Sequence, residues 1–256
     1  MNIEAIHSKD GNIYWIEQGD TMYYGRLQHG QYQSTNWDFA QTIVQSWQRC
    51  IDIGSNNAVN AIHYAKRFNT VECFEPTPLA QTLWTNTVRD NSVSNVTLHT
   101  SALGETPRTT QIITHPRNGG HNHLQHFDKN PRSRGTTKAT VDVDVRTLDS
   151  YKFTQVGFIK IDVEGYELFV LQGAMQTITT NRPVLQLELV EKQCRKFNYA
   201  RTDIADLFDA LNYRCCSKIN GWIDLRTHKE GRGEMDLFFV PQEKIRLLPP
   251  HLALFV

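Results

Sequence analysis

Cys50-Ile51-Asp52-Ile53-Gly54-Ser55-Asn56-Asn57-Ala58 is the stretch that decides the expected fold of this chain. Apolar residues lead into an acid, Asp52, and a short turn of Gly, Ser and Asn precedes a helical pattern over 58–68. A buried strand, a tight turn and a helix N-terminus form a nucleotide cradle, because small turn residues let the backbone approach a ligand closely. The next strand, 70–74, ends in Glu75, where an acid would hold ribose hydroxyls.

The composition of the turn favours one kind of cofactor over another. A dinucleotide site has the pattern G-x-G-x-x-G, whereas here Gly54 is followed by Asn56 and Ala58 at the other two positions. Pyrophosphate needs several close backbone approaches, so the turn suits it poorly. S-adenosylmethionine, with an uncharged middle and an amino-acid end, fits better. The alternative is an α/β turn that binds no ligand.

The composition is that of a globular protein. Of 256 residues, 39% are hydrophobic and 21% charged, which fits one large domain. The formal net charge is zero, so no overall field attracts nucleic acid or an anionic membrane. The first residues lack the apolar core of a secretory signal, and no apolar run reaches the roughly 18 residues that span a bilayer. We therefore expect a cytoplasmic protein without membrane contact.

The cysteines give no sign of a disulfide framework or a zinc site. They number five, an odd count, and none is spaced as C-x-x-C. They are Cys50, Cys73, Cys194, Cys215 and Cys216. Cys50 and Cys73 lie inside expected core strands, where cysteine behaves as a small hydrophobe. Reduced thiols are therefore expected.

Strands and helices alternate along most of the chain, which predicts a mostly parallel sheet of right-handed βαβ units. Two alternating runs at 13–16 and 22–27 predict an N-terminal hairpin, followed by a helix over 35–47. The expected core strands are 49–53, 70–74, 95–101, 156–161 and 184–189, and the expected helices are 58–68, 78–90, 166–177 and 202–211. Finally, 213–219 and 235–240 predict an antiparallel pair.

The alternation stops at Glu105. Residues 107–114 and 136–146 predict two further strands, and 115–135 between them is an exposed loop rich in His, Gly, Asn, Arg and Lys. Long ordered loops inserted in a sheet are often functional. We therefore treat 105–146 as an inserted flap.

Several motifs outside the first turn carry a family resemblance. They are Phe74-Glu75-Pro76, Thr147-Leu148-Asp149, Ile159-Lys160-Ile161-Asp162-Val163-Glu164-Gly165-Tyr166-Glu167, Val170-Leu-Gln-Gly-Ala174, Arg182-Pro183 and Leu185-Gln-Leu-Glu188. With the first turn, they resemble the FkbM family of S-adenosylmethionine-dependent methyltransferases over about 51–240. Ala58 departs from the family pattern, which usually has glycine there, so a slightly altered turn is expected.

The resemblance implies a class I methyltransferase fold, Rossmann-like, with a seven-stranded mostly parallel sheet, an antiparallel last strand and helices on both faces. It also implies O-methylation of sugar or natural-product hydroxyls. On this basis we expect three parts: an N-terminal hairpin and helix extension (1–48), an S-adenosylmethionine-binding methyltransferase domain (49–241) and a C-terminal tail (242–256).

The expected cofactor site lies at the ends of the first three core strands. Asp52 anchors the amino-acid end of the cofactor directly or orders the turn, Glu75 accepts hydrogen bonds from both ribose hydroxyls, and Ser101 and Ala102 border the adenine. The full set of expected cofactor-binding residues is Asp52, Gly54, Ser55, Asn56, Glu75, Pro76, Ser101, Ala102 and Asp162. The product would be S-adenosylhomocysteine.

The expected catalytic groups follow the fourth and fifth core strands, where open α/β sheets place their chemistry. Methyl transfer from a sulfonium needs in-line positioning and a proton acceptor. Asp162 can take the proton of the acceptor, orient it, or bind a divalent cation together with Glu188; a cation stays open but is not favoured, and no metal ligand is assigned. Glu164 either joins this group or caps the next helix. Lys160, between Ile159 and Ile161, is expected to point away from the crevice.

The histidines of the inserted loop give a second set of candidates. His115, His121, His123 and His126 lie close together in the sequence. They can be solvated loop residues or metal ligands, or His121 or His123 can be the general base if the flap closes over substrate. Basic residues of the same stretch are either solvated or contact a phosphate-bearing acceptor. They are Arg108, Arg117, Lys129, Arg132, Arg134 and Lys138.

The sequence therefore predicts an O-methyltransferase that uses S-adenosylmethionine and acts on a hydroxyl of a sugar or sugar-containing small molecule. Two alternatives stay open: a ribose or nucleic-acid methyltransferase, which the basic flap favours, and a non-catalytic cofactor-binding scaffold. The acceptor is a small molecule in the first reading and RNA in the second. A homodimer through the apolar tail or the N-terminal hairpin is also left open.

Overall fold

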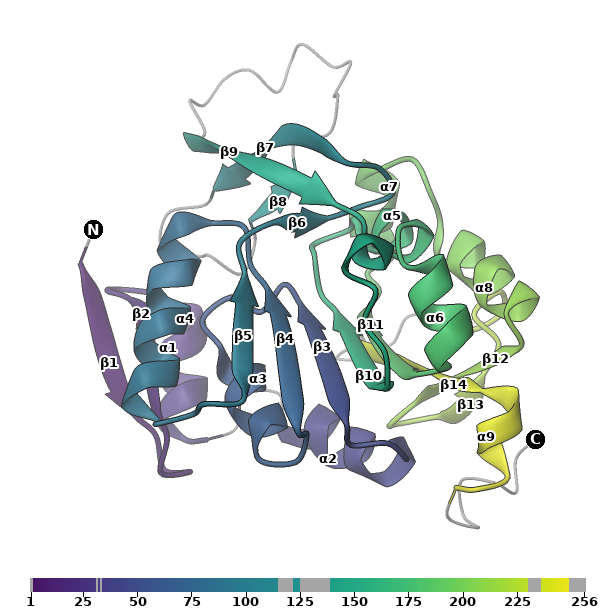
Figure 1. The fold of residues 1–256 in the computed structure, drawn as a ribbon, viewed down its shortest axis with the longest axis horizontal. Helices are drawn as coiled ribbons and strands as arrows, with labels where there is room; N and C mark the ends of the chain where they lie inside the picture. The colour runs from purple at the N-terminus through teal and green to yellow at the C-terminus, as the bar shows by residue number, and fades with distance from the viewer. Residues whose placement is uncertain are drawn as a thin grey trace.

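An eight-stranded sheet forms the centre of the computed structural model, which describes residues 2–30, 32, 34–114, 122–124, 139–229 and 236–248, with backbone alone at 21, 22 and 123 (Figure 1). The strand order across the sheet is β13-β12-β14-β11-β10-β3-β4-β5. In chain order the strands are β3 (Arg49–Ile53), β4 (Thr70–Phe74), β5 (Val96–His99), β10 (Val156–Ile161), β11 (Val184–Glu188), β12 (Tyr213–Ser217), β13 (Gly221–Ile223) and β14 (Asp236–Pro241).

The sheet is parallel from β5 to β11 and antiparallel beyond it. β10 lies between β3 and β11, and β14 pairs antiparallel with both β11 and β12. This arrangement is the class I methyltransferase topology that the sequence predicts. The sheet has eight strands rather than seven, because the chain turns back at Asn220-Gly221 and adds β13 at the edge. Gly221 has a φ of +66°, which suits it to this turn.

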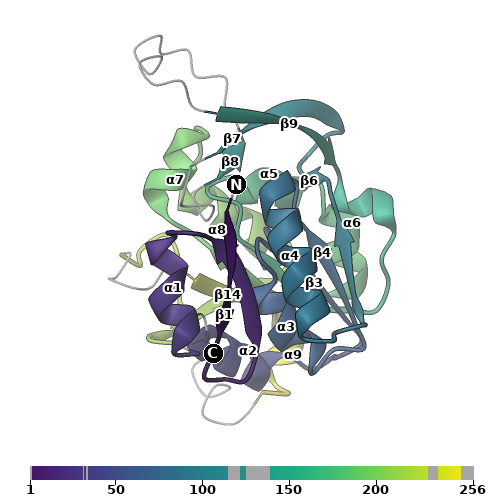
Figure 2. The ribbon, with the colours of Figure 1, turned by 90° about the vertical axis from the view of Figure 1, so that its left-hand side faces the viewer.

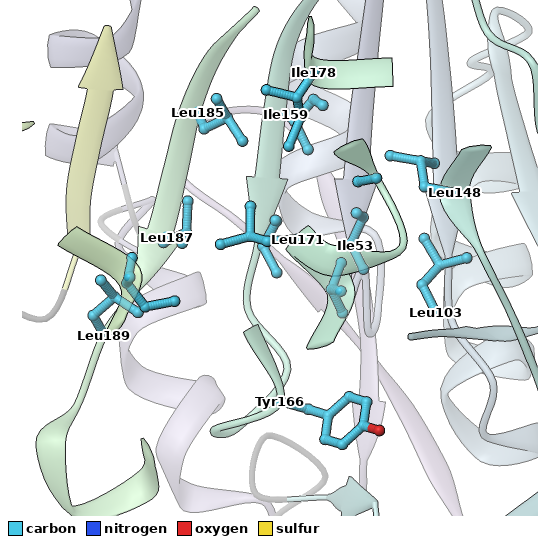
Figure 3. Packing of buried hydrophobic residues seen from close by; sticks show 14 of the residues in the cluster. Ile53, Leu103, Leu148, Ile159, Tyr166, Leu171, Ile178, Leu185, Leu187 and Leu189 are labelled. Atoms are coloured by element: carbon cyan, nitrogen blue, oxygen red, sulfur yellow. The ribbon is translucent and has the colours of Figure 1, made fainter. Parts of the chain in front are cut away.

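Two apolar cores lie on opposite faces of the sheet, because side chains alternate along each strand. On β3, Ile51 and Ile53 belong to one core and Cys50 to the other. The first core packs under α5 (Glu167–Gln172), α6 (Met175–Asn181) and α8 (Arg201–Ala210) (Figure 3). The second packs under α2 (Ser34–Ile43), α3 (Val59–Ala65) and α4 (Pro78–Asp90). Helices therefore cover both faces of the sheet, which confirms that part of the predicted fold.

After β10 and β11, one predicted helix is divided in two and one helix was not predicted. The helix expected over 166–177 is two helices, α5 and α6, which break at Gly173. A Cβ at Gly173 would lie 2.0 Å from the carbonyl oxygen of Gly104, so the close approach of a neighbouring backbone explains the break. A short helix that the sequence did not predict, α7 (Glu191–Lys196), follows β11.

The described part of the predicted flap, together with the strand just before it, forms a second sheet of four strands above the carboxyl ends of the central strands (Figure 1). Its strands are β6 (Ala102–Leu103), β7 (Arg108–Thr114), β8 (His123–Leu124) and β9 (Ala139–Arg146), in the order β6-β9-β7-β8. The two strands predicted at 107–114 and 136–146 therefore exist and pair antiparallel. They make a sheet of their own rather than joining the central one. A one-turn 3-10 helix (Leu148–Tyr151) then leads towards β10.

The N-terminal hairpin contains only one of its two predicted strands, 13–16, and pairs it with a different segment. It pairs β1 (Ile3–His7) with β2 (Ile13–Glu17), and the run 22–27 lies in a helix, α1 (Thr21–Gln28). Asp20 explains the helix, because its Oδ1 accepts a hydrogen bond from the Tyr23 backbone N at 3.1 Å. Tyr23 and Leu27, four residues apart, are buried on one face. The next helix, α2, ends at Ile43 rather than near residue 47.

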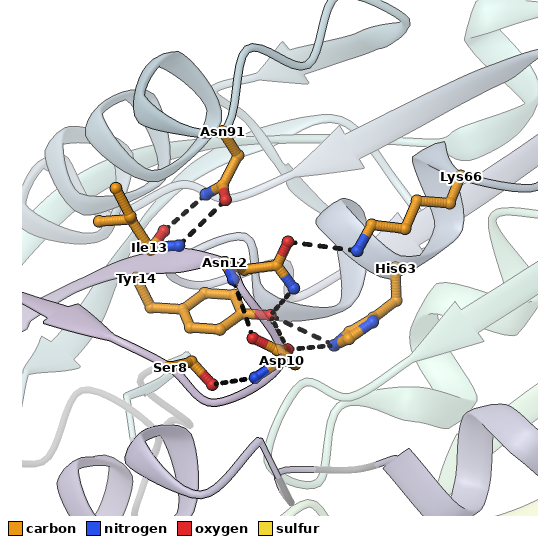
Figure 4. Close-up of polar contacts among 8 residues, drawn as sticks. All are labelled: Ser8, Asp10, Asn12, Ile13, Tyr14, His63, Lys66 and Asn91. Carbon is orange, nitrogen blue, oxygen red and sulfur yellow. Dashed lines mark hydrogen bonds and ion pairs between the residues drawn. The ribbon is translucent and has the colours of Figure 1, made fainter.

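The hairpin is attached to the central domain by a polar cluster (Figure 4). Asn91 at the end of α4 exchanges two hydrogen bonds with the backbone of Ile13, at 3.0 and 2.6 Å. Lys66 after α3 donates to Asn12 Oδ1 at 3.2 Å, and the Tyr14 hydroxyl lies 3.3 Å from His63 Nε2. Figure 2 shows β1, α1 and α4 on the same side of the molecule.

The remaining predictions on the chain ends and cysteines have mixed outcomes. All five cysteines are free, and four are buried, as expected of reduced thiols. A last helix, α9 (Gln242–Ile245), packs against β14, whereas 249–256 of the predicted tail and the Gly231–Gly233 turn lie outside the described residues. Within the described ranges, no helix is long and apolar enough to cross a membrane.

Candidate functional site

A cavity of about 590 Å³ lies at the carboxyl ends of β3, β4, β10 and β11, beneath the second sheet. This volume is in the range of small-molecule sites. Nine of the residues predicted for cofactor binding or catalysis line it together: Gly54, Ser55, Asn56, Glu75, Pro76, Ser101, Ala102, Asp162 and Glu188. Asp52 does not line the cavity.

The turn after β3 brings its backbone against the end of β10. Gly54 has a φ of +82°, and a Cβ at this position would lie 1.9 Å from the carbonyl oxygen of Asp162. The backbone N atoms of Gly54 and Ser55 donate to the Phe74 carbonyl at 3.0 and 3.1 Å, which fixes the turn to β4. Ala58 is fully buried with a φ of +69°, so the turn keeps the left-handed conformation that glycine would adopt more easily.

Glu75 links this turn to the start of α4. Its Oε2 accepts from the Asn56 backbone N at 3.1 Å, and its Oε1 accepts from the backbone N and hydroxyl of Thr77 at 2.9 and 2.6 Å. Burial raises the pKa of Glu75, while these three hydrogen bonds oppose the shift. Each carboxylate oxygen has about two acceptor sites, so Oε1 is filled by Thr77 and Oε2 keeps capacity for a ribose hydroxyl.

Asp52 is a fully buried acid beneath the turn. Neither of its oxygens has a hydrogen-bond partner among the described residues. Burial raises its pKa, and the charge of Lys160 opposes this. The Ser55 hydroxyl accepts from Trp84 Nε1 at 3.1 Å, and its proximity also lowers the pKa of Asp52. Because Asp52 does not reach the cavity wall, ordering the turn suits this position better than direct contact.

Lys160 faces the crevice, so the prediction that it points away was wrong. Its side chain is 1% exposed and lines the cavity floor, with Nζ 2.8 Å from Asp162 Oδ2. The alternation with Ile159 and Ile161 does turn Lys160 to the opposite face of the sheet from those two residues. The same alternation places Asp162 on the Lys160 side, and Asp52 on β3 is in register with Lys160. Burial lowers the pKa of Lys160, but the charges of Asp162 and Asp52 outweigh it and keep the amine protonated.

Three carboxylates meet at the end of β10 and β11. Asp162, Glu164 and Glu188 each offer an oxygen, and these oxygens lie within 4.8 Å of one another. Repulsion from Asp162, together with burial, raises the pKa of Glu188 well above its ordinary value, and burial and then Asp162 raise that of Glu164 to about 8. The spacing suits a divalent cation. Lys160 already supplies one positive charge to this group of carboxylates. That none of these residues binds a metal stays a prediction.

Glu164 does not cap the following helix. Its Oε2 accepts from Gln193 Nε2 at 2.5 Å, so it faces α7 and the cavity. The backbone N atoms of Val163 and Gly165 are instead satisfied by Glu167 Oε1, at 3.2 and 3.1 Å.

The predicted histidine bases stay predictions. His121, and with it His115 and His126, lies outside the described residues. The backbone of His123 pairs with Ile113 in the second sheet, and its side chain is not described. Arg108, predicted as part of a basic surface, instead contacts the Tyr166 hydroxyl and pairs with Glu105 Oε1 at 3.0 Å.

Seven other residues that line the cavity were not predicted from the sequence, and they come from the N-terminal and C-terminal parts of the chain. They are Tyr23, Arg26, Tyr32, Thr35, Asn36, Lys218 and Asp236. Asp236 opposes Glu188 across β11 and β14, and its Oδ2 accepts from Asn36 Nδ2 at 2.6 Å. An acid at the first residue of the last strand was a signal that could have placed Asp236. Nothing local marks the others, because they reach the cavity through long-range packing.

Comparison with known proteins identifies the family. The "Methyltransferase FkbM domain" family matches residues 52–215. The chain belongs to the FkbM methyltransferase family. The curated "Methyltransferase 1" of Beauveria bassiana (strain ARSEF 2860) is 24% identical over 141 residues, 48% of this chain and 57% of that protein. This chain thus matches little more than half the length of that relative.

Solved structures resemble this chain at low sequence identity. The crystal structure of an FkbM methyltransferase from Methylobacillus flagellatus is 21% identical, covers 75% of this chain and 43% of that chain, and has a TM-score of 0.48. A putative methyltransferase from Streptococcus mutans in complex with S-adenosylhomocysteine is 9% identical, covers 80% of this chain and 93% of that chain, and has a TM-score of 0.47.

S-adenosylmethionine is the cofactor of this methyltransferase family, and the residues of this chain fit it. The Gly54 turn has no room for a side chain, and Glu75 presents a buried carboxylate to the cavity. Gly54, Asn56 and Glu75 would hold the cofactor against the ends of β3 and β4.

Glu167 makes the stability of the folded chain depend on pH. It is fully buried, and burial raises its pKa to about 7 from the ordinary 4.5. Between these values the folded state holds the proton more tightly than the unfolded state, so Glu167 lowers the free energy of unfolding as the pH rises through this window, by at most about 3 kcal/mol. We expect the difference in unfolding free energy between the wild type and Glu167→Gln to change from pH 4.5 to 7 and then to level off. Urea unfolding at half-unit pH steps measures it, and a difference independent of pH contradicts it.

Proposed function

We propose that this chain transfers a methyl group to a hydroxyl of a sugar or sugar-containing small molecule. The observation that carries the proposal is the position of Asp162. Its backbone carbonyl abuts the Gly54 turn of the cofactor site, and its carboxylate lines the cavity beside Glu188. A proton acceptor therefore lies next to the place where the cofactor would be held, as O-methylation requires.

The residues around Asp162 suit it to that role. The bound cofactor supplies a methyl group on a positively charged sulfur. Lys160 orients the Asp162 carboxylate through the 2.8 Å ion pair and stabilises its charge. Glu188, whose pKa is raised, is protonated at neutral pH and can donate a hydrogen bond to an acceptor oxygen. Asp162 would then accept the proton that the acceptor hydroxyl loses.

The described lining of the cavity mixes acidic and basic residues. Asp162, Glu164, Glu188 and Asp236 line it together with Arg26, Lys160 and Lys218. Nucleic-acid binding relies on clusters of basic residues that neutralise phosphates, and this mixed lining is not such a cluster. The second candidate, methylation of a ribose in RNA, rests on the basic residues of 115–138, which lie outside the described residues.

A labelled methyl-transfer assay tests the proposal, with Asp162→Asn as the decisive variant. We expect the wild type to methylate at least one member of a panel of methyl glycosides, deoxysugars and N-acetylhexosamines. Asp162→Asn should lower kcat roughly 100- to 1,000-fold, because it removes the proton acceptor. Its affinity for S-adenosylhomocysteine, measured by calorimetry, should stay within about 10-fold of the wild type.

Asp38→Asn is the matched control, because Asp38 is an exposed acid of α2 that does not line the cavity. It should keep wild-type kcat. Methylation of RNA but of no sugar, with an affinity that falls as salt rises, would replace the first proposal by the second. Cofactor binding without turnover of any sugar, nucleoside or RNA would instead indicate a scaffold.

A further inference from the structure

The N-terminal segment lies outside the family match, 52–215, yet it forms one wall of the cavity. Five of its side chains line that wall: Tyr23, Arg26, Tyr32, Thr35 and Asn36. α1 and the hairpin share an apolar core with Val59 and Ile62 of α3, the helix that follows the cofactor turn. The segment is therefore packed against the element that positions the cofactor turn.

Polar contacts hold this wall in place at both ends. At one end, Trp15 Nε1 donates to Asp90 Oδ2 at 2.7 Å, which ties β2 to α4. At the other, Asn36 is buried and donates to Asp236 on β14 at 2.6 Å, while Lys218 Nζ donates to Thr35 Oγ1 at 2.9 Å. At this second end, the wall is hydrogen-bonded to residues that lie about 200 positions later in the sequence.

Two tyrosines of the wall connect the cofactor turn to the carboxylates. The Tyr23 hydroxyl accepts from Asn56 Nδ2 at 3.1 Å, and Asn56 is the turn residue whose backbone N binds Glu75. The rings of Tyr23 and Tyr32 pack against each other with their centroids 5.0 Å apart, and both side chains line the cavity. Beyond Tyr23, the charges that act on the Tyr32 hydroxyl are those of Asp162, Lys160 and Glu188.

The Tyr32 hydroxyl is a hydrogen-bond donor in the wall of the cavity. Its side chain lines the same cavity as Lys160, Asp162 and Glu188. A phenolic hydroxyl has one hydrogen to donate, so Tyr32 can bind an acceptor oxygen held beside these groups. Burial and then the charge of Asp162 raise the pKa of Tyr32 to about 12, so the hydroxyl keeps this hydrogen at neutral pH.

We propose that Tyr32 contacts the methyl acceptor, donating a hydrogen bond that positions the acceptor oxygen beside Asp162, and that Tyr23 and Asn56 hold Tyr32 in place. The inference rests on the proposed function, because it concerns the acceptor end of the same cavity. It makes the N-terminal segment part of the acceptor site and assigns it a role in acceptor choice. Tyr23 is a positioning residue, because it acts through Tyr32.

Three single substitutions of tyrosine by phenylalanine test the inference. Tyr32→Phe removes the donor and keeps the ring. Tyr23→Phe removes the hydrogen bond from Asn56 and keeps the ring that packs against Tyr32. Tyr24→Phe is the control, because Tyr24 is 45% exposed and does not line the cavity. Steady-state kinetics with the best sugar acceptor gives KM and kcat separately, and calorimetry gives the affinity for S-adenosylhomocysteine. Calorimetric titration of the S-adenosylhomocysteine-bound protein with the same sugar measures acceptor binding without turnover.

We expect Tyr32→Phe to lower kcat/KM for the acceptor by about 10- to 50-fold, with cofactor affinity within about 2-fold of the wild type. Tyr23→Phe should have a smaller effect on kcat/KM and should also weaken cofactor binding, because Asn56 loses its partner. Tyr24→Phe should match the wild type in every readout.

Other outcomes overturn the inference or the proposed function separately. Unchanged kcat/KM in Tyr32→Phe, or an equal loss of cofactor and acceptor binding, overturns the role of Tyr32 and leaves the proposed function standing. A wild type that binds sugars but methylates none overturns the proposed function, while weaker sugar binding by Tyr32→Phe still supports the contact. A wild type that binds no sugar overturns both.

Discussion

Replacing Lys160 with methionine is expected to lower the free energy of unfolding by about 3–5 kcal/mol. The lysine is 1% exposed and lies among Asp52, Asp162 and Asp236, all of which contribute to its raised pKa. Methionine fills a similar volume but leaves these acids without the buried charge that compensates them. Breaking a buried pair on one side is costly because the remaining charge has neither water nor a partner.

The pH dependence of Lys160→Met distinguishes lost charge from lost packing. Without the lysine, the acids hold protons more tightly in the folded state than in the unfolded state, so stability should rise as the pH falls from 7 towards 5. The double variant Lys160→Met/Asp52→Asn should recover part of the loss. Lys192→Met, on the exposed face of α7, is the control and should change the unfolding free energy by no more than about 0.5 kcal/mol. Chemical denaturation of the four proteins at pH 5, 6 and 7 is the measurement, and a Lys160→Met variant as stable as the wild type contradicts the prediction.

The parts of the fold predicted from sequence are those whose signal is local. The strands 49–53, 70–74 and 156–161 have the predicted bounds, because buried parallel strands are short apolar runs bounded by turns. The helix 78–90 also has its predicted bounds, since Pro78 opens it and the apolar positions follow a helical period. Errors occurred where a local pattern has two readings: 22–27 alternates like a strand, yet the cap at Asp20 makes it a helix.

The candidate site was predictable to the extent that its residues end predicted strands. Glu75, Asp162 and Glu188 follow β4, β10 and β11 or end them, and parallel strands bring such positions to one edge of a sheet. The side chain of Lys160 was predicted to point away from the crevice. Its alternation with Ile159 and Ile161 was predicted correctly, but the sequence did not show that the crevice lies on the Lys160 side of the sheet. Asn36 and Asp236 meet across 200 residues of sequence, and no short-range pattern predicts that contact.

Gly54→Ala is the second change with a large expected effect, because it acts on the fold and the site at once. A Cβ at this position would lie 1.9 Å from the Asp162 carbonyl oxygen, and alanine is strained at a φ of +82°. The backbone conformation costs about 1–2 kcal/mol, and the forced separation of the β3 turn from the β10 end costs about 1–3 kcal/mol more. We expect a loss of roughly 2–5 kcal/mol in unfolding free energy and a loss of at least about 100-fold in affinity for S-adenosylhomocysteine.

Gly221→Ala separates the strain of a positive φ from the loss of close approach. Gly221 has a φ of +66°, and a Cβ there would meet no atom within 4 Å, so alanine should cost about 1–2 kcal/mol and leave cofactor affinity unchanged. Urea unfolding and calorimetry on both variants make the comparison. If Gly54→Ala binds S-adenosylhomocysteine within about 3-fold of the wild type, the close contact between the turn and Asp162 is not required. If the affinity is lost, the missing side chain of Gly54 is what allows the cofactor turn and the proposed proton acceptor to lie side by side.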